Sequence, residues 1–175
     1  MQSSLRPSDI AVLLYICVHP GEAYGQMASI LGISKSTAHG AVLRLQLSGL
    51  VHADQDKRLE ASPRATIELL LMGVPYVFPA VTVPKARGIP TGLAAAGRSD
   101  AELVDATIMV WPSRLGTTVG VGVPPLIATA PDIALRDPAV YRLLALVDAV
   151  RAGDIREREM AATVLRSAVT GAVRA

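Results

Sequence analysis

The stretch LGISKSTAHGAVLRLQLSGLV, Leu31 to Val51, decides the fold of the N-terminal part of the chain. Ser34 is placed to cap a helix, because its hydroxyl can accept a hydrogen bond from a backbone N–H of the first turn. Gly49 is a typical helix end, and Gly32 permits a backbone conformation that residues with a Cβ disfavour. We therefore expect a helix over 34–48, entered through a tight turn and followed directly by a strand.

A helical wheel, at roughly 100° per residue, divides this helix into two faces. The face expected to enter the core carries Ala38, Ala41, Val42, Leu45 and Ser48. The opposite face carries Lys35, Ser36, His39, Gly40, Leu43, Gln46 and Leu47, with Thr37 and Arg44 on the flanks.

The segments around this helix complete a compact pattern. A first helix over 9–18 follows Pro7 and Ser8, and a short second helix over 23–32 precedes the central one. Leu50 and Val51 on one side and Leu59 and Ala61 on the other flank a polar tip at 54–58, which predicts a β-hairpin. Ser62 and Pro63 then open a further helix, for which Gly73 is the expected end.

The stretch from Gly25 to Val51 resembles the helix-turn-helix of MarR-type bacterial winged-helix regulators. The residues that carry the resemblance are Met27-Ala28, LGIS at 31–34, Ser36-Thr37-Ala38, Leu45 and SGLV at 48–51. The resemblance extends over residues 5–73. It implies that the helix over 34–48 is a recognition helix and that the hairpin is a wing.

In such a motif the first turns of the recognition helix lie against base edges in the major groove. This places Lys35, Ser36 and His39 towards bases, with Thr37 and Arg44 able to reach phosphates. At the wing tip, DQDKR at 54–58, the residues expected to contact DNA are Gln55, Lys57 and Arg58. A solvated turn whose two acids cancel its bases is the alternative for that tip.

The second half of the recognition helix departs from the family pattern. Related regulators tend to carry basic or polar residues where this chain has Gly40 and Leu43. Gly40 would allow close approach to the DNA backbone, and Leu43 could touch a thymine methyl group. Alternatively, Leu43 and Leu47 form an apolar stripe covered by the C-terminal part or by a second subunit.

The remainder of the chain predicts a small β-containing unit and a pair of helices. Residues 74–83 are typical of a strand broken by prolines, and 84–97 of a basic loop. Short strands are expected at 106–112 and 117–123, with glycines that let them bend or pack closely. Helical spacing marks 139–153, opened by Asp137-Pro138, and 155–169, capped by Asp154; Asp148 is expected on a helix surface.

The fold class expected is therefore α+β. Residues 1–73 are expected to form a winged helix-turn-helix domain, as the resemblance implies, and residues 74–175 an α+β unit for dimerisation, sensing or partner binding. Lys85, Arg87 and Arg98 form a basic stretch in that unit. Lys85 and Arg87 are candidate accessory contacts to DNA or to an acidic partner, and a plain exposed loop is the alternative.

Composition narrows the possible functions. One cysteine excludes a disulfide framework and a cysteine-rich zinc site, and it points to a reducing cytosol, with Cys17 as a buried inert thiol. The apolar run 10–18 is far shorter than the roughly 20 residues of a membrane span, so we expect a cytoplasmic protein. No nucleophile motif, metal spacing or paired carboxylates are visible, so neither an enzyme nor a cofactor is expected.

The charge distribution makes strong DNA binding by one copy unexpected. Residues 1–72 hold six basic and six acidic side chains, and the whole chain has a net charge of only +2. A homodimer would double the phosphate contacts. The function expected is therefore a dimeric, sequence-specific regulator of transcription, most simply a repressor that binds double-stranded DNA. The alternatives are an antitoxin-like autoregulator whose C-terminal unit binds a partner protein, and a winged helix that serves as a protein-interaction scaffold.

Overall fold

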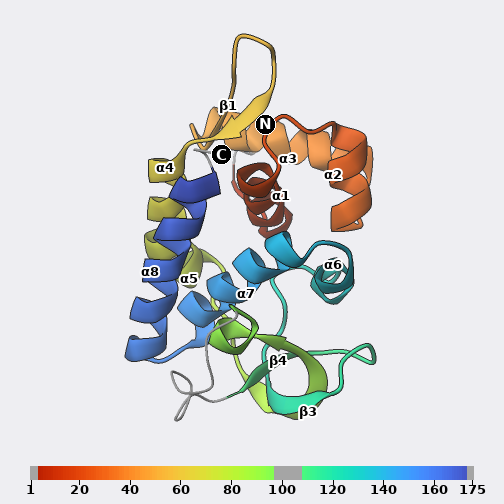
Figure 1. The fold of residues 1–175 in the computed structure, drawn as a ribbon, viewed down its shortest axis with the longest axis vertical. Coiled ribbons are helices and arrows are strands. Elements are labelled where there is room, and N and C mark those ends of the chain that lie inside the picture. Colours follow the sequence, from red (N-terminus) through yellow and green to blue (C-terminus); the bar gives the residue numbers. More distant parts are fainter. Residues whose placement is uncertain (1–3, 97–107, 173–175) are drawn as a thin grey trace.

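A computed structural model of the chain describes residues 4–96 and 108–172 and has an α+β fold. Figure 1 shows a hairpin and three helices at one end of the molecule and a small β-barrel at the other, with long helices between them. The predicted fold class is confirmed.

The first six elements follow the predicted order of three helices, a hairpin and a helix. The two hairpin strands are antiparallel, with Val51 opposite Ala61 and Ala53 opposite Leu59. The elements are α1 (Pro7–Val18), α2 (Tyr24–Leu31), α3 (Lys35–Leu47), β1 (Val51–Ala53), β2 (Leu59–Ala61) and α4 (Pro63–Glu68).

The helix that begins at Pro63 does not end at Gly73, so that prediction was wrong. The chain continues through one turn of π-helix, η1 (Leu69–Gly73), into α5 (Val74–Val77). Pro75 lies at the start of α5, directly after the π-helical turn. The strand predicted over 74–83 is accordingly wrong: residues 74–77 are helical, residues 78–82 are in neither a helix nor a strand, and only Val83 belongs to a strand.

Three strands form the small barrel: β3 (Val83–Thr91), β4 (Met109–Pro112) and β5 (Thr118–Gly122). Strand β3 is antiparallel to both others, while β4 and β5 are parallel. The two later strands were predicted, whereas the loop predicted over 84–97 was wrong. The chain pairs there in spite of its prolines, because Pro84 falls at an irregularity between Val83 and Lys85. A short 3₁₀ segment, η2 (Gly92–Ala96), follows β3.

Close backbone contacts explain two glycines of this barrel. A Cβ on Gly88 would lie 1.9 Å from the carbonyl oxygen of Trp111, and one on Gly120 would lie 2.4 Å from the carbonyl oxygen of Ile108. Neither space admits a side chain. The expectation that the glycines of this region serve close packing is therefore confirmed at Gly120.

The C-terminal part consists of α6 (Ala130–Arg136), α7 (Pro138–Ala152) and α8 (Ile155–Ala172). The predicted caps are present: Asp137 accepts hydrogen bonds from the N–H groups of Ala139 and Val140. Asp154 and Glu157 cap one another reciprocally at the start of α8. Helix α6 was not predicted, because its seven residues are too few for a clear period.

Asp148 is buried rather than on a helix surface, so that prediction was wrong. Its carboxylate accepts hydrogen bonds from Thr91 Oγ1 at 3.0 Å, from the indole N–H of Trp111 and from Arg151. Burial raises the pKa of Asp148, and the charge of Arg151 and these hydrogen bonds oppose that shift. Arg151 also donates to the carbonyl of Phe78 at 2.7 Å. This network ties the barrel and the end of α5 to α7.

One hydrophobic core runs through both ends of the described chain. Helix α1 is buried from Asp9 to Cys17 and packs against both α3 and α7. Polar contacts join the same regions: Thr129 Oγ1 donates to the carbonyl of Leu31 at 2.8 Å, and His19 Nε2 lies 2.6 Å from Asp137 Oδ2. The N-terminal helices and the C-terminal helices are therefore packed against each other.

Cys17 is 1% exposed, and burial raises the pKa of its thiol to about 12. Because the thiolate is the nucleophile, we expect labelling by a disulfide reagent at about pH 8 to be at least ~100-fold slower in the folded protein than in denaturant. Absorbance of the released thiolate gives both rates. Equal rates would show that α1 opens readily and would contradict this packing.

Among the residues that the structure describes, no helix combines the length and the apolar character needed to cross a membrane.

Candidate nucleic-acid interface

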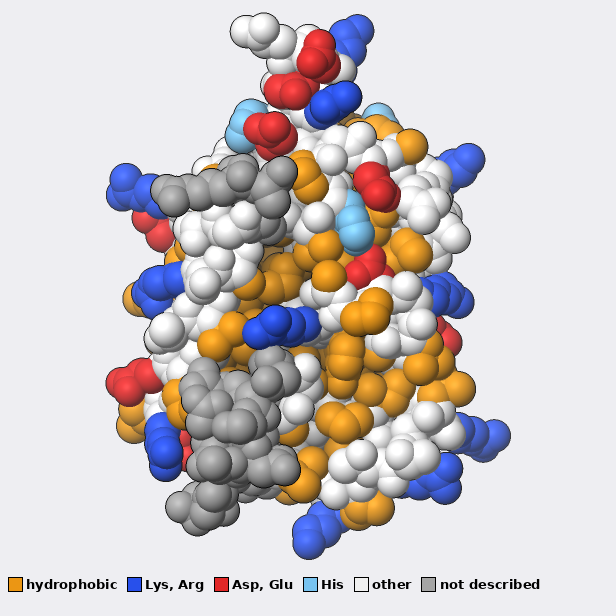
Figure 2. All heavy atoms as spheres, viewed as in Figure 1, with side chains coloured by type: hydrophobic (Ala, Val, Ile, Leu, Met, Phe, Trp, Pro, Cys, Tyr) orange, Lys and Arg blue, Asp and Glu red, His pale blue; other side chains and the backbone are white. Residues whose placement is uncertain are grey.

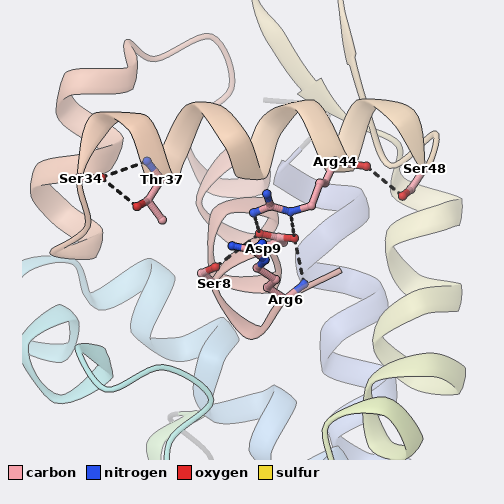
Figure 3. A network of polar contacts seen from close by, with 7 residues as sticks. All are labelled: Arg6, Ser8, Asp9, Ser34, Thr37, Arg44 and Ser48. Carbon is pink, nitrogen blue, oxygen red and sulfur yellow. Dashed lines mark hydrogen bonds and ion pairs between the residues drawn. The ribbon is translucent and has the colours of Figure 1, made fainter. Parts of the chain in front are cut away.

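The start of α3 is fixed by Ser34, as predicted. Its Oγ accepts a hydrogen bond from the backbone N–H of Thr37 at 3.0 Å. The hydroxyl groups of Ser36 and Thr37 each lie 2.8 Å from the same oxygen. These contacts hold the first turn of α3 in one conformation, and Figure 3 shows those between Ser34 and Thr37.

The inner side of α3 is anchored by a buried ion pair. Asp9 in α1 is 0% exposed, and its two oxygens accept from Arg44 Nε at 2.7 Å and from Arg44 Nη2 at 2.6 Å. The backbone N–H of Arg6 donates to the same carboxylate at 2.9 Å. Figure 3 shows Arg44 directed from α3 down to the start of α1. Planar bidentate pairing of this kind fixes orientation as well as distance.

This ion pair changes the role of Arg44. The sequence placed Arg44 on the flank of α3 as a phosphate contact, whereas its guanidinium is engaged inside the protein. A phosphate contact would require breaking two charged hydrogen bonds and leaving Asp9 buried without a partner. Arg44 therefore positions α3 against α1 instead of contributing to the interface.

The outer side of the first turns of α3 carries four exposed polar side chains. They are Lys35, Ser36, Thr37 and His39. The His39 ring packs against the ring of Tyr24 in α2, with their centroids 5.5 Å apart. Lys35 leans over α2, because a Cβ on Gly25 would lie 3.4 Å from Lys35 Cε. Together they form a continuous polar edge, which we call the α3 edge.

Tyr24 was missing from the predicted site. It begins α2 and lies beside His39 only because the turn at Gly32, with a left-handed φ of 64°, brings α2 against α3. No local spacing in the sequence connects the two rings. The sequence indicated that His39 lies near the start of a helix, but it gave no sign that Tyr24 lies beside it.

The predicted wing residues Gln55, Lys57 and Arg58 are all exposed. Asp54 closes the turn by accepting from the N–H of Arg58 at 2.8 Å, and Lys57 adopts a left-handed φ of 62°. The aliphatic part of Arg58 lies against Gly21, since a Cβ there would be 3.2 Å from it. Arg58 is therefore held towards the turn between α1 and α2 rather than beyond the tip.

The charge of this surface is mixed. Figure 2 shows acidic and basic side chains side by side at the projecting hairpin. Asp54 and Asp56 are interleaved with Lys57 and Arg58 in the tip sequence. Attraction to a phosphate backbone must therefore come from the arrangement of a few cations rather than from a broad basic face.

The second half of α3 exposes its leucines. Leu43 is 48% exposed and Leu47 is 64% exposed, so the described C-terminal helices do not cover them. Four of the five predicted core positions of α3 are buried, but Ser48 is exposed, and its Oγ donates to the carbonyl of Arg44 at 2.9 Å. Ser48 was misplaced because the helix ends there and its side chain caps rather than packs.

Lys85 and Arg87 lie far from this surface. Both belong to β3 in the barrel, which occupies the end of the molecule opposite to the hairpin (Figure 1). Arg87 Nε donates to the carbonyl of Gly116 at 2.8 Å. These residues do not extend the α3 edge; Arg98, the third basic residue of that stretch, lies outside the described residues.

Within residues 4–96 and 108–172, no three His, Cys, Asp or Glu side chains come together in a way that could hold a metal ion. No family model matches the chain, and no curated protein or solved structure matches it.

Proposed function

We propose that this chain is a sequence-specific double-stranded DNA-binding regulator of transcription, acting as a homodimeric repressor in the cytoplasm. In this proposal α1 to α3 and the β1–β2 hairpin act as a winged helix-turn-helix of the MarR-like kind. The α3 edge enters the major groove, and Gln55, Lys57 and Arg58 approach the neighbouring backbone or minor groove.

The observation that carries the proposal is the contrast between the two sides of α3. Its inner side is locked by Arg44 and Asp9, while its capped first turns expose Lys35, Ser36, Thr37 and His39. Lysine, serine and histidine at this place can donate to or accept from base edges and phosphates. A rigidly held, exposed polar helix start next to a projecting hairpin is the geometry used by helix-turn-helix proteins.

Two copies are proposed because one copy has few cations. Each copy offers Lys35, Lys57 and Arg58 near α3 and the wing, against Asp54 and Asp56. Doubling these contacts roughly doubles the electrostatic contribution to affinity. Two α3 helices about one DNA turn, ~34 Å, apart would bind a palindromic site. Occupying a promoter in this way blocks transcription without any contact to a polymerase.

The test is selection of bound duplexes from a pool carrying about 30 random base pairs, enough for two half-sites one turn apart. On the selected duplex, we expect Lys35→Ala and His39→Ala each to weaken binding about tenfold. Lys57→Gly removes a charge while suiting the left-handed backbone. It is expected to reduce the slope of log K against log salt by about 1.8, because each copy of the dimer loses one phosphate contact worth about 0.9. Fluorescence anisotropy at several salt concentrations measures both effects.

The matched control is Lys85→Ala on the barrel, for which we expect less than about a twofold change. If no duplex is enriched, or if the α3 edge variants behave like the control, the DNA proposal fails. In that case the exposed Leu43 and Leu47 favour the second candidate, a helix surface that contacts another protein.

A further inference from the structure

A groove with a volume of about 490 Å³ lies on the surface of the C-terminal part. One of its sides is formed by η1 and α5, and the other by α8. Val150 of α7 and Ala162 of α8 are among its apolar lining residues. Met72 and Tyr76 line the side formed by η1 and α5, and Arg158 and Arg166 line the α8 side. Figure 1 shows α5 and α8 on one side of the molecule, with α2 on the other.

The η1–α5 side of the groove is unusually apolar for a surface. Met72 is 71% exposed and Tyr76 is 79% exposed. The same stretch of chain continues with Val77 at 62% and Val81 at 73%. Large apolar side chains gathered in one exposed segment are typical of a contact surface. Met72 belongs to η1, and a turn of π-helix is a rare element that occurs often at functional sites.

The α8 side of the groove is cationic. Arg158, Ala162 and Arg166 recur every four residues along one stripe of the helix, and Glu159 is the single acid of the lining. Arg158 Nε donates to the carbonyl of Gly153 at 2.8 Å, which holds its stem in place. Neither arginine forms an ion pair with any residue that the structure describes.

We propose that this groove binds an amphipathic helix of a partner protein, with its apolar face between Tyr76 and α8 and with flanking Asp or Glu side chains paired to Arg158 and Arg166. Tyrosine and arginine are enriched at the energetic centres of interfaces, and methionine is enriched in interfaces relative to the rest of the surface. The two arginines are eight residues apart on α8, which spans about 12 Å at 1.5 Å per residue. A helix of two to three turns with apolar residues at i, i+3 or i+4 and i+7 fits this length.

Charge argues against a second copy of this chain as the occupant. A two-fold dimer through this surface would place groove against groove and gather the four groove arginines of the two copies in one interface, with only the two Glu159 carboxylates to offset them. Like charges facing each other across an interface disfavour the complex. An acidic partner has the opposite sign and meets no such penalty. The groove contains no residue of α3, so this site is separate from the proposed DNA surface.

The experiment is a display selection of random peptides of about 16 residues, long enough for four helical turns, on the full chain. Selected peptides are then synthesised, and their affinity is measured by fluorescence anisotropy. We expect them to combine apolar residues at helical spacing with Asp or Glu. Arg158→Glu with Arg166→Glu is expected to weaken binding at least ~30-fold, and Tyr76→Ala about tenfold.

Two controls separate this result from the DNA proposal. Arg156→Glu makes the same charge reversal on α8 at an exposed position outside the groove and is expected to leave peptide affinity unchanged. Lys35→Ala, which tests DNA binding, is also expected to leave it unchanged. The peptide result and the DNA result can therefore fail independently.

Three outcomes would overturn the proposal. The selection yields no peptide whose binding depends on Tyr76 and the two arginines, or it yields peptides without acids. Alternatively, the chain sediments as a dimer that Met72→Glu with Tyr76→Glu converts to a monomer, which would make a second copy the occupant.

Discussion

Replacing Asp9 by alanine is expected to lower the free energy of unfolding by about 3 to 5 kcal/mol. The carboxylate is fully buried, and it holds both nitrogens of the Arg44 fork as well as the N–H of Arg6. Its removal leaves Arg44, whose side chain is only 16% exposed, without its partner. Arginine stays protonated in proteins even without a carboxylate partner, so the guanidinium would remain charged. Urea unfolding followed by circular dichroism measures the loss.

Two variants make this prediction specific. Asp56→Ala removes an exposed carboxylate at the hairpin tip and is expected to change stability by less than about 0.5 kcal/mol. Asp9→Leu combined with Arg44→Met replaces the whole pair with apolar groups and is expected to recover most of the loss. A change of less than about 1 kcal/mol in Asp9→Ala would mean that the pair behaves as a surface pair and does not anchor α3.

Asp148→Ala is expected to cost a similar amount, about 3 to 5 kcal/mol, because three donors converge on this one buried carboxylate. The substitution leaves Arg151 buried without its partner and the Trp111 N–H without an acceptor. The barrel would then lose its polar link to α7. Trp111 is the only tryptophan of the chain, so its fluorescence reports unfolding at this very place.

Asp148→Asn is the second variant, in case the alanine variant does not fold. It retains an acceptor for Trp111 but removes the charge opposite Arg151, so an intermediate loss of about 2 kcal/mol is expected. The control is Asp132→Ala in the first turn of α6, which is exposed and is expected to cost at most about 1 kcal/mol. If Asp148→Ala matches the control, the network does not hold the barrel on α7.

The sequence predicted correctly those helices and strands whose ends depend on residues nearby in the chain. Ser34, Asp137 and Asp154 each cap the helix that the sequence indicated, because a cap depends on a side chain and the next three residues. The β1–β2 hairpin followed for the same reason, since its strands are joined by a short polar turn.

The errors arose where distant partners decide the structure. Strand β3 contains two prolines and was taken for a loop, yet it pairs with strands on both of its edges. Segment 74–77 was predicted to be a strand because apolar residues, proline and tyrosine follow one another there. In the structure it continues the preceding helix, and Val74 is buried. Short apolar runs cannot be assigned to helix or strand by periodicity alone.

The same limit applies to the candidate site. The polar residues at the start of α3 could be chosen from the wheel, because exposure there follows from the helix itself. The inward direction of Arg44 could not, since its partner Asp9 lies in another helix. Charged side chains are expected at the surface by default, and Arg44 and Asp148 both depart from that default through a buried partner.

The packing of helix α1 restricts how this protein can evolve by recombination. It is buried on every side, and it faces α3 with one surface and α7 and α8 with another. A recombination event that joined residues 1–73 to a different C-terminal part would therefore also have to supply a matching surface for α1. Exchange of the C-terminal part between proteins is correspondingly restricted here, and the two halves of this chain are expected to evolve as one unit.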